Sequence, residues 1–401
     1  MGYKNLLSQK NRSKVLTIIQ EQGPINKAVI AEQAMLSIPT VMKITADFEQ
    51  NRLVKTVGKG ESTGGKRPDL LEFVSDAYYI LGVDVGRRKV KAVLMDMGAN
   101  IVAKNSIPVI EEHVCVPEVF VCDVAEQVNT LLRQSPIQRD KIMGIGVGMP
   151  GIIDHQSGHV RFSPDFNWED VPLMELLRQH FSCPIMIENG NRTLALGEYT
   201  YGAGKGASHM FCINLGHGIG GAIVNHGEIL HGASGSIGEF GHVVMDPKGP
   251  LCDCGNRGCL EALSSGNSIA KRAEAEIAAG KKTILTEISG KIEAKDVFDA
   301  AYKKDALSQE IVRDAIVTLG YAIASIINLI DPDVIVVAGG ISKAWDYYEE
   351  LLLKTVREHK MRYSGEKACI ELNKLGDYGP AIGAATLLVQ SFIKKGGRLT
   401  D

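Results

Sequence analysis

Residues 239–261 hold the densest group of side chains that could do chemistry. Three cysteines, Cys252, Cys254 and Cys259, fall within eight residues, and His242 lies ten residues before the first of them. Three thiolates and one imidazole form a complete tetrahedral ligand set for zinc. Glycines between the cysteines permit the tight turns that would bring the sulfurs to one point. The pattern predicts a structural zinc site, because all four positions are filled by protein.

Two other interpretations of the cluster remain open, namely disulfide pairing and inert thiols. The five remaining cysteines are scattered along the chain and are typical of small buried apolar residues. They are Cys115, Cys122, Cys183, Cys212 and Cys369. The sequence contains no run of about 18 apolar residues, so it predicts no membrane span. Its first residues lack the apolar run of a signal peptide. We therefore expect a cytoplasmic protein, where thiols stay reduced and metal binding is favoured over disulfides.

Charge is distributed unevenly along the 401 residues. The first 70 residues carry 11 Lys and Arg against 6 Asp and Glu, a net of +5, whereas the rest of the chain has a net of −8. The whole chain is 45% hydrophobic, which is ordinary for a protein that buries a large core. A basic N-terminal segment (the basic front) before an acidic remainder (the body) indicates that the first forms a module that binds an anionic partner, whereas the second does not.

The basic front has the pattern of a helix-turn-helix. Asn11, Asn26 and Ser37 are placed to cap three successive helices. The third helix would begin near Ile38 with a proline in its first turn. Its predicted inner stripe is Val41, Ile44 and Phe48. In this plan the last helix enters the major groove of DNA with its N-terminal residues.

Two strand-like runs, 53–57 and 70–74, follow the third helix and flank a basic loop rich in glycine. This arrangement is typical of the wing of a winged helix, whose Lys and Arg contact phosphates or the minor groove. A protein-interaction module or a purely structural helical bundle is the alternative. The residues predicted to contact DNA are Ile38, Thr40, Lys43, Lys59, Lys66 and Arg67.

The body predicts two similar α/β halves in tandem, each opening with consecutive strands. The first half begins with a buried run over 78–86, and the pattern restarts at 210. This duplication resembles the two-lobe actin-like, or ribonuclease H-like, ATPase fold, in which the lobes enclose a ligand. The expected fold class is therefore α/β, with an N-terminal winged helix-turn-helix before the duplicated fold. The expected domains are 1–76, then lobe 1 at 77–186 with the closing helix 380–401, and lobe 2 with the zinc motif at 187–379.

Several motifs together resemble the ROK family of repressors, open reading frames and kinases. They are Gly-Met-Pro-Gly-Ile-Ile-Asp (148–154), Gly-x-Gly-Ile-Gly-Gly (216–221), Gly-Glu-Phe-Gly-His (238–242), Cys-x-Cys-Gly-Asn-x-Gly-Cys-Leu-Glu (252–261) and Val-Ala-Gly-Gly (337–340). The Gly-Gly-Lys-Arg-Pro of the wing is similar to that of the family's repressors. The resemblance implies that His242, Cys252, Cys254 and Cys259 bind zinc. It also implies sugar-hydroxyl contacts from Asn189, Glu239, His242 and Glu261.

The chain departs from the pattern of the family's sugar kinases where phosphoryl transfer needs specific groups. The position of the general base is Gly190, which has no side chain to accept a proton. Arg87 and Arg88 replace the Gly and Thr of the first phosphate loop, and His217 replaces a Thr in the second. Asp165 stands where the family usually has Asn, so the identity of the sugar stays open.

These departures predict a regulator that has no kinase activity and no catalytic residues. We expect a sugar-responsive repressor of carbohydrate-utilisation genes that binds operator DNA, takes a sugar or sugar derivative between its lobes and forms dimers or tetramers. An ATP-dependent sugar kinase of the glucokinase or N-acetylhexosamine kinase type, with a DNA-binding appendage, is the first alternative. A zinc-sensing regulator is the second, although a closed four-ligand site disfavours it.

Overall fold

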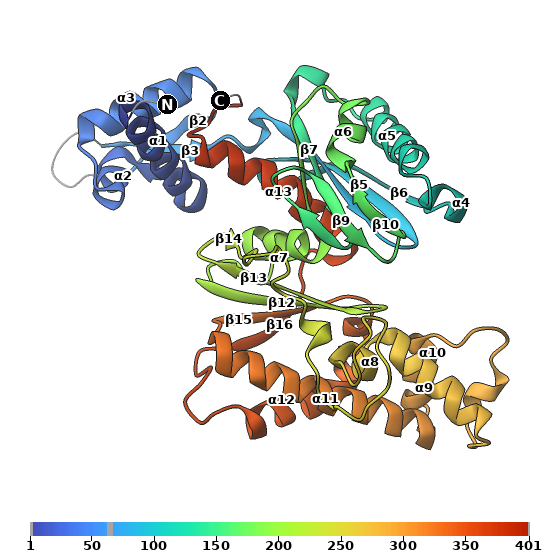
Figure 1. Cartoon of the computed structure of the whole chain (residues 1–401). Coiled ribbons are helices and arrows are strands. Elements are labelled where there is room, and N and C mark those ends of the chain that lie inside the picture. The colour runs from blue at the N-terminus through green and yellow to red at the C-terminus, as the bar shows by residue number, and fades with distance from the viewer. Residues whose placement is uncertain (1–2, 62–66, 400–401) are drawn as a thin grey trace. The chain divides into compact units, whose positions relative to one another are not determined.

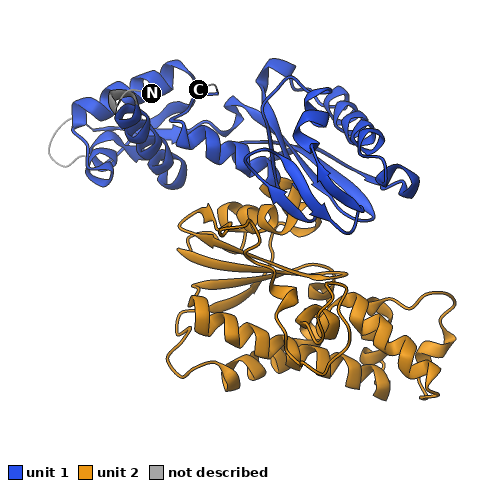
Figure 2. Cartoon of the chain, in the orientation of Figure 1, with its two compact units in different colours: residues 1–188, 384–401 blue, residues 189–383 orange. Residues whose placement is uncertain are grey.

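The computed structural model describes residues 3–61 and 67–399. The chain divides into two compact units, one made of residues 1–188 and 384–401 and the other of residues 189–383 (Figure 2). Among the described residues, no helix combines the length and the hydropathy that crossing a membrane requires.

The N-terminal module of unit 1 consists of three helices and a three-stranded antiparallel sheet in the order β1-β3-β2 (Figure 1). The Asn26 side chain accepts hydrogen bonds from the first turn of the second helix, and Ser37 caps the third, as expected. The prediction for Asn11 was wrong, because this residue lies inside a 20-residue first helix. The elements are α1 (Tyr3–Gln22), β1 (Ile25–Asn26), α2 (Lys27–Ala34), α3 (Ile38–Gln50), β2 (Val54–Lys59) and β3 (Asp69–Phe73).

A five-stranded sheet of order β11-β7-β4-β5-β6 forms the centre of the remainder of unit 1. Helix α5 contributes Phe120, Val124 and Val128 to the core on this sheet. A small antiparallel sheet, β10-β9-β8, follows β7 in the chain and was not predicted. The elements are β4 (Tyr79–Val85), β5 (Lys89–Asp96), β6 (Ile101–Pro108), α4 (Glu111–Val114), α5 (Pro117–Gln134), β7 (Ile142–Met149), β8 (Ile152–Asp154), β9 (His159–Ser163), β10 (Trp168–Val171), α6 (Leu173–Arg178) and β11 (Ile185–Asn189).

Unit 2 has a second five-stranded sheet, of order β14-β13-β12-β15-β16. Its main core is formed largely by the long helix α11 with α10, α12 and strands β12 and β15. The elements are α7 (Gly190–Tyr201), β12 (His209–Leu215), β13 (Ile219–Asn225), β14 (Glu228–Ile229), η3 (Phe240–His242), α8 (Leu260–Ser264), α9 (Gly266–Ala278), α10 (Ala294–Tyr302), α11 (Ala306–Ile330), β15 (Val334–Ala338), α12 (Trp345–His359) and β16 (Cys369–Leu372).

The two large sheets share one topology. In each five-stranded sheet, the strand that comes first in the chain pairs antiparallel with the second strand of that sheet and parallel with the fourth. Strand β4 therefore corresponds to β12, and β7 corresponds to β15. The third strand extends the antiparallel side in both sheets. This repeated order is the duplication that the sequence predicts.

The last helix, α13 (Gly379–Lys394), begins in unit 2 and continues into unit 1. Its first turn packs against α7, where a Cβ on Gly383 would lie 1.6 Å from the Thr193 carbonyl oxygen. Farther along, Ala384 lies as close to β7, since a Cβ on Gly146 would meet its carbonyl oxygen at 1.8 Å. Glycine at both positions is required by this close backbone approach.

Candidate functional site

The four predicted metal ligands are brought together in unit 2. The ligand atoms of His242, Cys252, Cys254 and Cys259 all lie within 4.8 Å of one another. The Cys252 Sγ lies 3.7 Å from the His242 Nδ1, and the Cys254 and Cys259 sulfurs are 3.6 Å apart. A tetrahedral zinc ion separates its ligand atoms by about 3.6–3.8 Å, so the donor set fits this ion in both chemistry and spacing.

The backbone around the cluster is tightly folded. Isolated β-bridges join Val244 to Cys259 and Leu251 to Arg257. Gly258 has φ +65°, and a Cβ there would lie 1.5 Å from the Asp246 carbonyl oxygen, so only glycine fits. Backbone pairing and tight turns therefore hold the four donor groups of this loop close together.

The three thiols have different environments. Burial raises the pKa of Cys259 to about 12 and also raises the pKa of Cys252. A hydrogen bond from the Asn256 backbone N–H lowers the pKa of Cys254. Thiols this close together do not all ionise without a cation among them, and a divalent ion held there would supply that charge.

The two predicted sugar-binding carboxylates, Glu239 and Glu261, flank the metal-ligand cluster but have different surroundings. The Glu239 side chain is 49% exposed, and its Oε2 lies 3.8 Å from the His242 Nε2. With Nδ1 directed at the cysteines, the second ring nitrogen of His242 lies on the Glu239 side. The Glu261 Oε2 accepts a hydrogen bond of 2.8 Å from the Ile219 backbone N–H. Glu261 thus fixes the start of β13, whereas Glu239 is available to a ligand.

Asn189 lies at the N-terminus of α7. Its Oδ1 accepts hydrogen bonds from Asn191 and Arg192 and caps α7. Asn191 touches the start of β13, since a Cβ on Gly220 would lie 2.0 Å from the Asn191 Nδ2. Glu261 and the segment carrying Glu239 and His242 therefore lie at the start of β13, and Asn189 caps the helix whose Asn191 contacts the same strand.

Arg192 is a residue that the sequence did not single out. Its side chain is buried in α7 with an exposed fraction of 3%, and its guanidinium donates to the carbonyls of Gly235 and Ile237. These carbonyls belong to the loop that ends at Glu239, so Arg192 positions the segment carrying this carboxylate. An arginine three residues after the Asn189 cap, in the first turn of a largely buried helix, was the available signal.

A pocket of about 490 Å³ lies beside the cluster in unit 2. Its lining includes Leu251, Cys252, Glu261, His217 and Lys271. Of the predicted sugar residues, only Glu261 lines it. The pocket is therefore next to the predicted sugar site and not the same as it.

In unit 1, two of the positions that depart from the kinase pattern contact each other. The Arg87 guanidinium lies 3.6 Å from the Asp165 carboxylate. Arg87 belongs to the β4–β5 loop and Asp165 to the β9–β10 loop. An arginine and its counter-charge therefore stand where the kinase pattern has a glycine that allows close approach of phosphate.

Gly190, at the position of the kinase base, is the first residue of α7 in unit 2. A Cβ there would meet no atom within 4 Å, so lack of space does not require glycine at this position.

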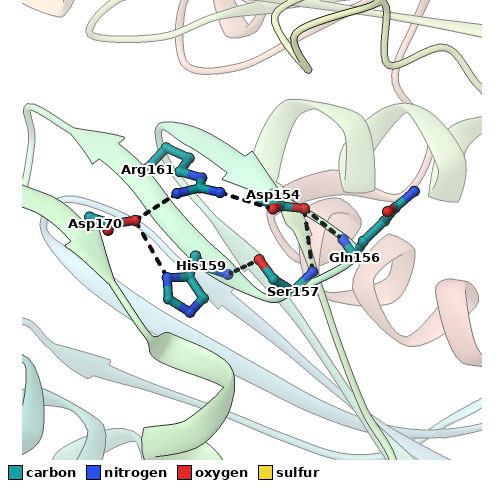
Figure 3. A network of polar contacts seen from close by, with 6 residues as sticks. All are labelled: Asp154, Gln156, Ser157, His159, Arg161 and Asp170. Atoms are coloured by element: carbon teal, nitrogen blue, oxygen red, sulfur yellow. Dashed lines mark hydrogen bonds and ion pairs between the residues drawn. The ribbon is translucent and has the colours of Figure 1, made fainter.

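A polar network stiffens the hairpin that carries Asp165 (Figure 3). Arg161 on β9 donates to Asp170 on β10 at 2.9 Å and to Asp154 on β8 at 3.3 Å. The His159 Nδ1 lies 3.4 Å from Asp170. Hydrogen bonds from Ser157 lower the pKa of Asp154 to about 2. All of these groups lie in the small sheet, so the network supports the loop of Asp165 from its base.

The residues predicted to contact DNA lie on α3 and the β2–β3 hairpin. The side chains of Ile38, Lys43 and Arg67 are exposed. The Thr40 hydroxyl lies 2.8 Å from the Ser37 Oγ and takes part in the helix cap. Lys59 forms an ion pair with Asp69. Lys66 lies outside the described residues.

Comparison with known sequences gives one family and two kinds of relative. The sequence profile of the ROK family matches residues 80–391. A glucokinase of Halalkalibacterium halodurans is 34% identical over 79% of the chain and 96% of its own length. The xylose repressor of Bacillus spizizenii is 26% identical over 97% of both chains. The DNA-binding transcriptional dual regulator NagC of Escherichia coli is 28% identical over 98% of the chain and 95% of its own length.

Solved structures divide in the same way. A ROK family transcriptional regulator, described as a homologue of the Escherichia coli MLC protein, matches 98% of both chains with a TM-score of 0.84 and 25% identity. The ROK hexokinase of Thermus thermophilus matches 77% of this chain and 96% of its own, with a TM-score of 0.65 and 28% identity. The two sheets thus have the actin-like α/β fold of these proteins.

Proposed function

The chain belongs to the ROK family, and from this premise we propose that it is a sugar-responsive transcriptional regulator that represses genes of carbohydrate use. The regulator would bind operator DNA with its N-terminal module and a sugar or sugar derivative with the duplicated body.

The observation that carries this proposal is the extent of the matches. The glucokinase and hexokinase relatives cover 79% and 77% of the chain, whereas the xylose repressor, NagC and the solved ROK regulator cover 97–98%. The family profile begins only at residue 80. The additional module before it, which contains α1–α3 and β1–β3, is therefore what this chain shares with regulators.

Within the proposal, residues 1–76 form a winged helix-turn-helix and the wing is the β2–β3 hairpin. Lobe 1 takes residues 77–186 with the closing helix 380–401, and lobe 2 takes residues 187–379. The short turn between α2 and α3, with Met35 at φ 55°, supports this assignment. The cap of α3 by Ser37 supports it as well, because the start of that helix is then well defined.

A structural zinc ion held by His242, Cys252, Cys254 and Cys259 is part of the proposal. Bound there, it supplies cross-linking of the loop and offsets the charge of the thiolates. The chain's own groups would then hold the sugar: Glu239 accepts from hydroxyls, and His242 donates from its Nε2. Glu261 keeps the strand end in place, and Asn189 completes the set from the start of α7.

The proposal assigns no catalytic residue to the chain. Gly190 offers no proton acceptor at the position of the kinase base, and loss of a positioned base costs about 10²–10⁴-fold in rate. Arg87 is held by Asp165 at the first phosphate loop. In the second loop, the backbone N–H groups of Gly266 and Asn267 already donate to the carbonyls of Gly216 and His217.

Helix α13 could transmit the effect of sugar binding to the DNA-binding module, because it contacts both α7 and that module. Its first turn packs on α7, the helix capped by Asn189. Its last residues contact the N-terminal module, where the Gln9 side chain donates to the Lys394 carbonyl at 3.3 Å. A sugar that favours one position of α7 would thereby favour one position of the module, which is a shift between two states of different DNA affinity.

Two measurements on the full chain test the proposal. Selection from random duplex DNA should enrich an inverted repeat, since a dimer or tetramer reads two half-sites. A thermal-shift screen of sugars and sugar phosphates should find one compound that raises the melting temperature. A ligand at 100 times its Kd adds about 2.7 kcal/mol. Absence of any DNA selection would contradict the assignment of the module.

An ATP-dependent sugar kinase is the second candidate, favoured by the 34% identity to the glucokinase. A coupled assay of ATP turnover with hexoses and N-acetylhexosamines separates the two. We expect no turnover above the background without protein. Clear turnover would contradict the role given to Gly190.

A further inference from the structure

The outward face of α3 is unusually apolar for a helix surface. Met35 in the preceding turn is 88% exposed, Ile38 is 51% exposed and Met42 is 54% exposed. The exposed residues of α3, all of which the structure describes, are Ile38, Pro39, Met42, Lys43, Ala46 and Gln50. Only Lys43 among them carries a charge.

Helix α12 has a different surface. The exposed face of α12 carries Glu349, Glu350, Lys354 and Glu358. The two carboxylates of α3 itself have contacts elsewhere. Asp47 pairs with Arg12 at 2.6 Å, and Glu49 accepts a hydrogen bond from Thr56 at 2.9 Å. The Asp47 side chain is 44% exposed, but it is paired with Arg12, so neither carboxylate of α3 is left without a partner to repel DNA.

The inner face of α3 is already used for packing. Val41, Ile44 and Phe48 are buried in the core of the module with exposed fractions of 0%, 8% and 0%. Ile38 and Met42 are one helical turn apart and lie on the outward face. Packing within the module therefore does not explain two large apolar side chains that stay in water.

If the module binds DNA as proposed above, these side chains have one apolar partner in the major groove. Each base pair presents hydrogen-bonding groups there, and thymine alone presents a methyl group. We propose that Ile38 and Met42 read thymine methyl groups, so that each operator half-site contains T·A pairs at the positions facing the start of α3. Lys43 would then contact phosphate or guanine beside them.

Uracil substitution tests this reading directly, because it removes only the C5-methyl group. A duplex selected by the full chain is compared with duplexes in which each half-site thymine is replaced by uracil, one position at a time. We expect about a fourfold loss of affinity at each contacted position, which corresponds to ~0.8 kcal/mol per buried methylene-sized group.

Variants of the exposed residues assign the contact. Ile38→Ala and Met42→Ala should weaken binding to the thymine duplex and leave binding to the matching uracil duplex unchanged. Met42→Leu should retain the preference for thymine. The matched control is Arg67→Ala in the wing, which should weaken both duplexes equally and preserve their ratio. Circular dichroism confirms that each variant is folded.

The outcomes separate this inference from the proposed function. Failure of the full chain to select any DNA would overturn the proposed function. Selection of DNA whose binding is insensitive to every thymine-to-uracil change, or whose half-sites are G·C pairs opposite α3, would overturn the methyl-reading role alone.

Discussion

The Arg12 Nε donates a hydrogen bond of 2.9 Å to the carbonyl oxygen of Gly396, although the two residues are 384 positions apart. Arg12 is 9% exposed, and its guanidinium also pairs with Asp47 and lies 4.8 Å from the centre of the Phe48 ring. Both of these residues belong to α3. One buried cation thus joins the end of the chain to the helix that we propose reads DNA.

Gly396→Ala should loosen this junction. Gly396 has φ +69°, and a Cβ there would lie 2.7 Å from the Arg12 Cβ. Left-handed backbone strain on a non-glycine residue costs about 1–3 kcal/mol. We expect a lower melting temperature and roughly fivefold weaker binding to selected DNA, the equivalent of about 1 kcal/mol.

Gly376→Ala is the matched control, since Gly376 has φ +61° and no atom within 4 Å of its Cβ position. It carries the same kind of strain without the contact to Arg12. If both variants weakened DNA binding equally, the junction between Arg12 and Gly396 would have no special role.

Loss of one metal ligand should unfold the loop at 239–261. Cys254→Ser removes a thiolate from a four-ligand cluster. We expect the purified wild type to contain one zinc per chain by elemental analysis, and the variant to contain none and to melt at lower temperature. Cys369→Ser, an exposed cysteine outside the cluster, is the control. Equal zinc content in Cys254→Ser and wild type would contradict the ligand assignment.

Asp84 should make the stability of the chain depend on pH. Burial in the sheet raises the pKa of Asp84 from 3.8 to about 6, and the charge of Lys91 offsets this only in part. A carboxyl whose folded pKa exceeds its unfolded pKa stabilises the fold below the unfolded value, and this contribution is lost as pH rises through the folded value. Wild type should therefore lose stability between pH 4 and 6.

The Asp84→Asn variant has no ionisable group at this position, so its stability should not fall between pH 4 and 6 for this reason. We expect its melting temperature to exceed that of wild type above pH 6, by the equivalent of about 1–3 kcal/mol, and the difference to shrink towards pH 4. Asp299→Asn, at an exposed position of α10, serves as the control. A difference that is independent of pH would show that Asp84 does not titrate in this range.

Substitution of Glu239 should affect sugar binding, whereas substitution of Glu261 should affect the stability of the fold. Glu239→Gln changes an exposed carboxylate and should leave the melting temperature within about 1 °C while abolishing the thermal shift produced by the sugar. Glu261→Gln weakens the acceptor of the Ile219 N–H and should lower the melting temperature by itself, since a hydrogen bond to a charged group contributes about 1.5–3 kcal/mol. Unchanged sugar binding by Glu239→Gln would remove this residue from the site.

Much of the fold could be predicted from local pattern. The runs from Met210 to Leu215 and from Ile142 to Gly148 are largely apolar, and the structure has strands there. The Cys and His spacing predicted a cluster because all its ligands lie within one short segment. Such features depend on residues near one another in sequence, which is why they can be recognised without a structure.

Other features depend on distant contacts and could not be predicted. The small β8–β10 sheet alternates polar and apolar residues only over short strands, and its ties are ion pairs such as Arg161 with Asp170. The pairing of Arg87 with Asp165 joins two loops almost 80 residues apart. The cap predicted at Asn11 is wrong because α1 already begins at Tyr3, eight residues earlier, with few apolar residues to mark that turn as helical.

The central claim is that binding of a sugar to the chain changes its affinity for operator DNA. The most direct test is a fluorescence-anisotropy titration of labelled, selected operator DNA with the full chain, with and without the sugar identified by thermal shift. We predict that saturating sugar changes the Kd for DNA at least about tenfold, and that DNA changes the Kd for the sugar by the same factor. Equal DNA affinity with and without the bound sugar would contradict the account.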